Sequence, residues 1–255
     1  MKQKTLCPTT GGLKLSTMKK IILLLFIMMP IILSAQEEVS WDFSVTPGTN
    51  EWNSLKTEKQ RINVMQIPEV VLNKMSSKAL IDACINFPLF GYYSAFNTPQ
   101  EGFNIMFSRF NIFNKICEKD SIGHYLIKIY KDAGMDGWET MSNKFNNEFW
   151  TLKLEYVEYL IAQKEVISKL SHQEKVDLLN IAKAKLIQKK SHKSFNSIPG
   201  ISPSLLIMSS ILNFDDTSST FIEQKNVQHL LKTGLLSDTE TINIILNLTE
   251  LYFNH

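Results

Sequence analysis

Apolar residues recur at steps of three and four along most of the chain after residue 50, and this spacing restricts the fold more than any other feature. Residues spaced in this way share one face of an α-helix, whereas a half-buried strand needs strict alternation. No run has that alternation or the paired turn residues of a β-hairpin. We therefore predict an all-α fold, a single globular array of about eight to ten helices in antiparallel pairs. The clearest run follows Pro99 and contains Phe103, Met106, Phe107, Phe110, Phe113 and Cys117.

Capping patterns indicate where several helices begin. Thr98, Ser171 and Ser237 are each followed three positions later by a glutamate. In such a capping box the hydroxyl accepts a hydrogen bond from a free backbone N–H, and the carboxylate reaches back to the N–H of the capping residue. Pro99 and Pro203 suit the first turn of a helix, where a missing N–H costs no hydrogen bond. We expect helices to start at these positions.

The longest apolar pattern predicts one helix from Asn143 to Leu170. Its apolar residues fall on two faces, and the stepping is interrupted at Gln163. A helix that is apolar on two sides is usually enclosed by neighbouring helices. We therefore predict that this helix lies at the centre of the fold.

Residues 18–35 have the three parts of a secretory signal peptide. Lys19 and Lys20 precede an apolar run of 13 residues, and the small residues Ser34 and Ala35 follow it. A bilayer crossing needs about 20 apolar residues, so we expect no permanent transmembrane segment after cleavage. We predict cleavage after Ala35 and export to the periplasm, the cell surface or the medium. Residues 1–17 are interpreted as an over-extended start.

Cleavage would change the charge of the protein. The formal net charge is +2, but five lysines and no acidic residue lie before residue 36, which leaves 22 basic and 25 acidic residues and a net charge of −3. A near-neutral protein has no global positive field, so nucleic acid is not an expected partner. We predict an extended arm over residues 36–50, with the rings of Trp41 and Phe43 buried on the helical body, and a helical domain over residues 51–255.

Cys84 and Cys117 are the two cysteines of the expected mature chain, and both fall on apolar sides of predicted helices. Two interpretations stay open. They are buried free thiols that pack as small apolar groups, or they form a disulfide in an oxidising compartment.

The segment from Gln66 to Phe103 carries a series of short motifs in a fixed order and spacing. With Thr46–Thr49 and Glu51-Trp52 upstream, this series resembles a family of uncharacterised secreted bacterial proteins over residues 46 to about 115. Members of that family typically have tyrosine at the positions of Phe87 and Phe96, so roles that need those hydroxyls do not carry over. The resemblance implies export and a helical fold, and it implies no activity. The motifs are Gln66-Ile67-Pro68-Glu69, Met75-Ser76-Ser77, Leu80, Asn86-Phe87-Pro88-Leu89, Ala95-Phe96-Asn97 and Gly102-Phe103.

Aromatic and amide side chains gather around the breaks at Pro88 and Gly91. Aromatic faces beside amides can stack on and hydrogen-bond a sugar or a peptide, and irregular segments between rigid helices often carry binding sites. Alternatively, the asparagines cap a tight turn and the tyrosines pack on it. The candidate binding residues are Asn86, Tyr92, Tyr93, Phe96 and Asn97.

No motif predicts a catalytic, cofactor or metal site. The histidines lack paired-ligand spacing, and no Gly-x-Ser-x-Gly, HExxH or phosphate-loop pattern occurs. Asp132, Asp136 and Glu139 have the wrong spacing for an EF-hand, so we interpret them as a solvated turn. The lysines from Lys183 to Lys193 suit either an anionic surface or the solvated face of a helix.

The first hypothesis is a secreted, non-catalytic helical protein that binds a protein, peptide or glycan partner through the aromatic turns. The alternative is a hydrolase acting on the cell envelope or another polymer, with a site assembled from several helices. A third hypothesis is an exported structural protein without a dedicated pocket. A groove with exposed rings would favour binding, and a deep cleft with carboxylates or a histidine of perturbed ionisation would favour hydrolysis.

Overall fold

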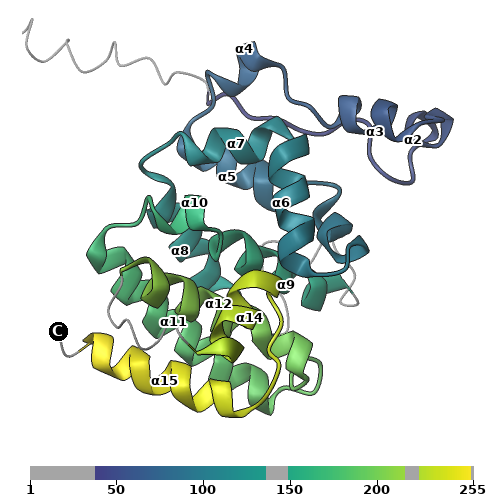
Figure 1. Cartoon of the computed structure of the whole chain (residues 1–255). Helices are drawn as coiled ribbons and strands as arrows, with labels where there is room; N and C mark the ends of the chain where they lie inside the picture. Colours follow the sequence, from purple (N-terminus) through teal and green to yellow (C-terminus); the bar gives the residue numbers. More distant parts are fainter. Residues whose placement is uncertain (1–37, 136–148, 216–223, 254–255) are drawn as a thin grey trace, which may run out of the picture. The chain divides into compact units, whose positions relative to one another are not determined.

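The computed structural model describes residues 38–135, 149–215 and 224–253 (Figure 1). Contacts divide the chain into two units, Met1–Glu38 and Val39–His255. The predicted signal peptide and the segment 1–17 lie outside the described residues. In the described part of the second unit every regular element is a helix, ten of them with seven residues or more, so the predicted all-α fold is confirmed. None of the described helices is long and apolar enough to cross a membrane.

The first half of the second unit starts at Val39, and the half-buried side chains of Val39, Trp41 and Phe43 pack against the core. The ring of Phe43 meets the ring of Phe87 edge-on, with 5.5 Å between centroids. Seven α-helices and one 3₁₀ helix follow: α2 (Asn50–Ser54), α3 (Glu58–Val64), α4 (Glu69–Leu72), α5 (Ser77–Ile85), η2 (Phe90–Ala95), α6 (Pro99–Arg109), α7 (Asn111–Cys117) and α8 (Ile122–Asp132).

The second half is built around α9 and α12. Residues Tyr156 to Ile161 of α9 and Gly200 to Ser209 of α12 are all buried. Helix α12 contacts α9, α10, α11, α14 and α15, so it is enclosed by neighbours. The helices of this half are α9 (Trp150–Ile161), α10 (Lys164–Ile167), α11 (His172–Ser191), α12 (Ile198–Phe214), α14 (Lys225–Thr233) and α15 (Glu240–Phe253).

The predicted central helix is buried, but it is not continuous. Its expected start at Asn143 lies outside the described residues, and α9 ends at Ile161 before α10 begins at Lys164. At the break, Gln163 has an extended backbone with ψ of 139°. Its side-chain Nε2 donates to the carbonyl of Tyr159 at 2.7 Å. The prediction of one helix through Leu170 is therefore wrong, because a side-chain hydrogen bond replaces the helical one at this point.

Side chains of α9 also hold the end of α5. The last carbonyls of a helix have no partner within the helix. The hydroxyl of Tyr156 donates to the carbonyl of Cys84 at 2.7 Å, and the ammonium group of Lys153 donates to the carbonyl of Ile85. Helix α9 thus fixes the position from which the turn at η2 departs.

The predicted helix starts are confirmed in part. Ser171 forms both halves of a capping box, and the hydroxyl of Thr98 accepts from the N–H of Glu101. At α15 the carboxylate of Asp238 accepts from the N–H of Thr241 at 2.9 Å, so the cap lies one residue after Ser237.

The start expected at Pro203 is wrong. Helix α12 begins at Ile198, where the hydroxyl of Ser197 accepts from the N–H of Gly200. Pro199 occupies the first turn instead, and Pro203 lies inside the helix. An internal proline removes one helical hydrogen bond, and here it is tolerated in a helix enclosed on several sides.

Both cysteines are free thiols in the structure, as in the first of the two interpretations. Burial raises the pKa of the Cys84 thiol, and it raises the pKa of the Cys117 thiol to about 12. Thiolates are the reactive form, so both side chains are poor nucleophiles in this fold.

Candidate functional site

The five residues predicted to bind a partner do not form one surface. Tyr92 and Phe96 are half-buried and meet edge-on, with ring centroids 5.2 Å apart. Tyr93 is only 2% exposed, whereas Asn86 and Asn97 are exposed. The structure therefore brings together one aromatic pair and separates it from Tyr93.

The ring of Tyr93 belongs to the core. It packs against Phe103 and Tyr159, with centroid distances of 5.1 and 5.4 Å. Its buried hydroxyl has no hydrogen-bond partner among the described residues. A glycine lets α6 approach this turn, because a Cβ at Gly102 would lie 2.2 Å from the backbone oxygen of Tyr93.

The hydroxyl of Tyr92 forms two hydrogen bonds within the protein. Its hydroxyl donates to the carboxylate of Glu58 at 3.0 Å and accepts from the guanidinium of Arg109 at 2.5 Å. Arg109 also pairs with Glu58, and this hydrogen bond is the main reason why the pKa of Glu58 lies below its usual value. The three side chains tie η2 to α3 and α6.

Asn86 and Asn97 each form a hydrogen bond to a residue four positions away in the chain. The side-chain Nδ2 of Asn86 donates to the carbonyl of Asp82 at 2.9 Å, and that of Asn97 donates to the carboxylate of Glu101 at 3.1 Å. These contacts match the alternative interpretation, in which the asparagines cap a turn. Partner binding by the pair of Tyr92 and Phe96 stays a prediction.

A second surface feature was missed by the sequence reasoning. A cavity of about 610 Å³ opens between α6, α10, α12 and α14, and we call it the amide groove. The buried side chains of Ala162 and Ile167 form its floor, and the exposed side chains of Lys164 and Lys232 stand at its rim. Its other described lining residues are Gln100, Asn104, Ser210, Asn213, Phe214 and Leu231.

The spacing of polar residues along α6 and α12 brings their side chains to the amide groove. Gln100 and Asn104 are one turn apart on α6, and Ser210 and Asn213 are three residues apart on α12, so each pair shares a face. The Nε2 group of Gln100 donates to the Oε1 atom of Gln163 at 2.7 Å. The break between α9 and α10 therefore helps to orient the amide of Gln100.

Phe214 is the aromatic residue of the groove, and it is 40% exposed. The ammonium group of Lys175 lies 4.3 Å from the centroid of its ring and pairs with the carboxylate of Asp215. Tyr252 donates to the same carboxylate at 2.6 Å, and the Nδ1 atom of His172 lies 3.2 Å from the Tyr252 hydroxyl. These contacts fasten α11, α12 and α15 together behind Phe214.

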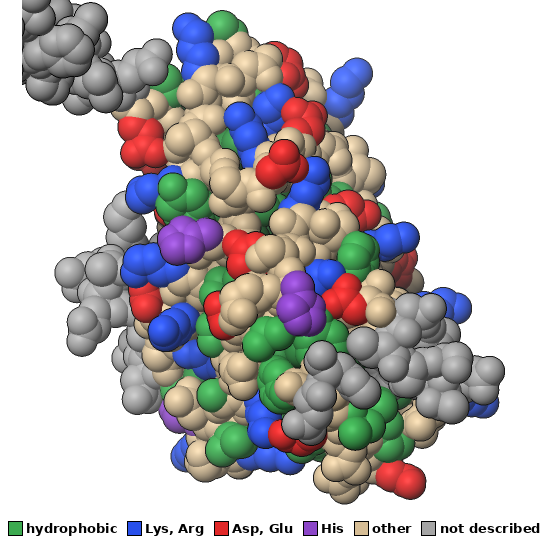
Figure 2. All heavy atoms as spheres, turned by 90° about the vertical axis from the view of Figure 1, so that its left-hand side faces the viewer, with side chains coloured by type: hydrophobic (Ala, Val, Ile, Leu, Met, Phe, Trp, Pro, Cys, Tyr) green, Lys and Arg blue, Asp and Glu red, His purple; other side chains and the backbone are tan. Residues whose placement is uncertain are grey.

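The amide groove has a local positive charge. Lys164 and Lys232 form no ion pair with any described residue, and no aspartate or glutamate is among the described lining residues. On the face drawn in Figure 2, by contrast, basic and acidic side chains are interspersed. Among the described residues, the positive character of the groove comes from Lys164 and Lys232.

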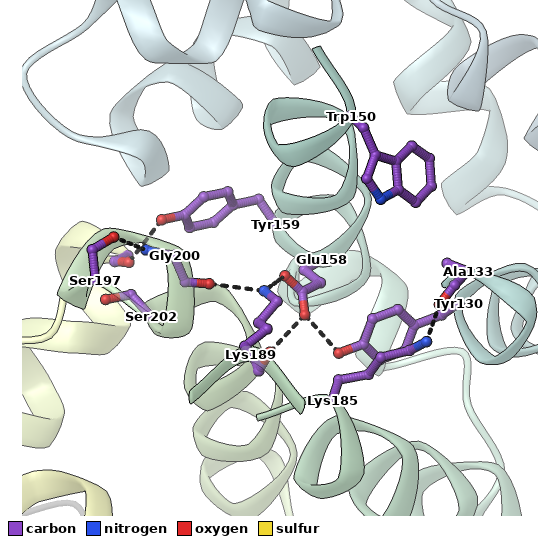
Figure 3. A network of polar contacts seen from close by, with 12 residues as sticks. Tyr130, Ala133, Trp150, Glu158, Tyr159, Lys185, Lys189, Ser197, Gly200 and Ser202 are labelled. Atoms are coloured by element: carbon purple, nitrogen blue, oxygen red, sulfur yellow. Dashed lines mark hydrogen bonds and ion pairs between the residues drawn. The ribbon is translucent and has the colours of Figure 1, made fainter. Parts of the chain in front are cut away.

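Figure 3 shows a polar cluster around Glu158, whose side chains are buried in the fold. Glu158 accepts from the hydroxyls of Tyr130 and Ser204 at 2.7 and 2.6 Å, and it pairs with Lys189. Lys189 also donates to the carbonyl of Gly200 at 2.9 Å. All four side chains are 0% exposed, so the cluster cannot receive a substrate without opening the fold. It joins α9 to α8, α11 and α12.

This cluster corrects the interpretation of the basic run from Lys183 to Lys193. Lys185 and Lys189 are one turn apart and buried, and Lys185 donates to the carbonyl of Ala133. Burial lowers the pKa of the Lys185 ammonium. The prediction that the whole run is a solvated or anion-binding face is wrong, because one side of α11 faces the core. Of the other lysines of the run, Lys183 is half-buried and pairs with Glu250, and Lys190 is exposed.

Among the described residues, no group of three or more His, Cys, Asp or Glu side chains is arranged to hold a metal ion. Asp136 and Glu139, which belong to the weighed calcium-loop pattern, lie outside the described residues.

Comparisons of the chain with protein-family models, with curated proteins and with solved structures each find no significant match. The resemblance of residues 46 to about 115 to a secreted bacterial family therefore stays a prediction.

Proposed function

We propose that the protein is an exported, non-catalytic binding protein that holds a short segment of a peptide or glycan partner in the amide groove. The observation that carries this proposal is an open cavity of about 610 Å³ with polar side chains from α6 and α12 above an apolar floor. Amide groups both donate and accept hydrogen bonds, so they can match a peptide main chain or sugar hydroxyls. Cavities of this size with a few placed polar groups are typical ligand sites.

The chemistry of the lining favours binding over hydrolysis. General acid–base catalysis usually depends on a histidine or carboxylate placed next to the substrate. The described lining residues of the groove supply amides, a hydroxyl, two ammonium groups and apolar surface. The buried carboxylate of Glu158 is held by three partners inside the core. Export rests on the pattern of residues 18–35.

The proposal can be tested with an array of short peptides and oligosaccharides. Ser210→Trp should fill the groove, whereas Ser108→Trp adds the same ring at an exposed position of α6 outside the groove. Both variants are first checked by thermal unfolding. We expect ligands bound by the wild type and Ser108→Trp to be lost by Ser210→Trp. Mass spectrometry should recover these ligands unchanged.

Two results would overturn the proposal. A ligand that binds Ser210→Trp as tightly as the wild type places the site elsewhere on the protein. A ligand recovered in cleaved form supports the hydrolase alternative.

A further inference from the structure

Two exposed lysines, Lys164 and Lys232, stand at the rim of the amide groove. Half-buried Lys169 pairs with Asp120 and half-buried Lys183 pairs with Glu250, whereas other exposed lysines, for example Lys56, form no ion pair with a described residue. Lys164 on α10 and Lys232 on α14 also lack an ion pair with a described residue, and they differ from the other lysines in that both line one cavity whose described lining contains no carboxylate. Two neighbouring ammonium groups without counter-charges attract an anionic ligand.

The remaining groups of the groove favour a peptide over a sugar. The amide of Gln100 already donates to Gln163 and Asn104. A peptide presents an N–H and a C=O at every residue, and the side-chain Nδ2 of Asn104 on α6 and the amide of Asn213 on α12 can pair with these groups. The apolar floor at Ala162 and Ile167 suits an aliphatic side chain.

Sugar stacking is less well supported because it needs a free aromatic face. The ring of Phe214 has the Lys175 ammonium 4.3 Å from its centroid, so one of its two faces is already occupied. The aliphatic side chains of Leu231 and Ile167 offer no flat surface for a sugar ring.

We propose that the amide groove binds an acidic peptide, with one or two carboxylates against Lys164 and Lys232 and an aliphatic side chain on the floor. This inference rests on the proposed function and names the ligand class of the same groove. The peptide carboxylates make binding selective for acidic ligands, and the floor buries the aliphatic side chain of the peptide. Affinity therefore falls with rising salt, because the rim lysines are exposed and screened.

The test uses two defined probes on the full chain, acetyl-Leu-Glu-Leu-Glu-Leu-amide and the same peptide with glutamine in place of glutamate. Binding is measured by isothermal titration calorimetry at low and high salt. Lys164→Met/Lys232→Met removes the two rim charges. The control Lys56→Met/Lys74→Met removes two exposed lysines outside the groove, so the net charge changes equally.

The acidic peptide should bind the wild type and the control alike, and it should bind the rim variant about tenfold more weakly, from two partly screened ion pairs. The glutamine peptide should bind all three proteins with the weaker affinity.

The outcomes separate this inference from the proposed function. Equal binding of the acidic and neutral peptides, with both lost in Ser210→Trp, refutes the charge selection and leaves the groove as a binding site. Binding of trigalacturonate but not of the acidic peptide refutes the peptide class and assigns an anionic glycan. No binding of either peptide at millimolar concentration refutes the inference, while the array with Ser210→Trp decides separately whether the groove binds anything.

Discussion

The ionisation of Lys153 should contribute strongly to the pH dependence of the stability of this protein. The side chain is 0% exposed, its ammonium group donates to the carbonyl of Ile85, and it lies 4.4 Å from the ring centroid of Phe90. Burial lowers the pKa of Lys153 from 10.5 to about 7. The folded state therefore prefers the neutral amine over a wide range in which the unfolded chain is protonated.

The direction of the effect follows from proton binding. Between pH 7 and 10.5 the unfolded state holds a proton that the folded state has released, so the free energy of unfolding rises with pH. Below pH 7 both states are protonated, and this residue adds no further pH dependence. A difference between 10.5 and about 7 corresponds to about 5 kcal/mol at about 1.4 kcal/mol per pKa unit. We expect about 3–5 kcal/mol, because the carbonyl and the aromatic rings stabilise the ammonium in part.

The assay compares urea unfolding of the wild type and Lys153→Met in steps from pH 7 to 10.5. Methionine keeps the length of the side chain without its charge. We expect the variant to be more stable at pH 7, and we expect its advantage to shrink by about 3–5 kcal/mol across the range. Buried tyrosines also titrate differently in the two states, but they are present in both proteins and cancel in the difference. Burial raises the pKa of Glu155 to about 7, so this carboxyl group changes the pH dependence of stability mainly below pH 7.

Lys74→Met is the control, since Lys74 is exposed. The difference in the free energy of unfolding between Lys74→Met and the wild type should not depend on pH. If the difference between Lys153→Met and the wild type changes by less than about 1 kcal/mol from pH 7 to 10.5, the reasoning about burial is refuted.

Three further predictions follow from other contacts. Lys189→Met leaves the buried Glu158 without its counter-charge and should cost about 3–5 kcal/mol in urea unfolding, and a loss below about 1 kcal/mol would show that the hydroxyls suffice. Gly102→Ala forces a methyl group onto the backbone oxygen of Tyr93 and should cost about 1–3 kcal/mol, whereas an unchanged melting curve would contradict the close approach of α6. Exported protein should begin at Gln36 by N-terminal sequencing, and a chain that retains residues 18–35 would contradict signal cleavage.

The helical class could be predicted from sequence because the three-and-four spacing is a local signal. Ser171 and Thr98 likewise cap their helices with atoms that lie within one turn. Other features depend on residues that are distant along the chain. The amide groove combines α6, α10, α12 and α14, and no local pattern identifies side chains from four helices as neighbours.

The sequence contains a pattern from which the buried charges could have been predicted. Lys153 and Glu158 lie within a helix that is apolar on two faces, and Lys185 and Lys189 are one turn apart on α11. A charged residue inside a helix with two apolar faces has few solvent-exposed positions available, so it usually needs a buried partner. The identity of that partner, for example Lys189 for Glu158, required the packing of α9 against α11 and α12.

The error in the longest predicted helix and the position of the groove have one physical cause. Gln163 ends the helical path by bonding to the carbonyl of Tyr159, and the chain resumes at Lys164 in a separate short helix. That break places Lys164 at the rim and Ile167 in the floor, and the amide of Gln163 holds Gln100. A continuous helix would keep Gln163 in the helical ladder and remove this support. Departures from a local rule often occur at functional sites, where a strained or interrupted element is retained. The interruption at Gln163 is therefore a further reason to seek the ligand in the amide groove.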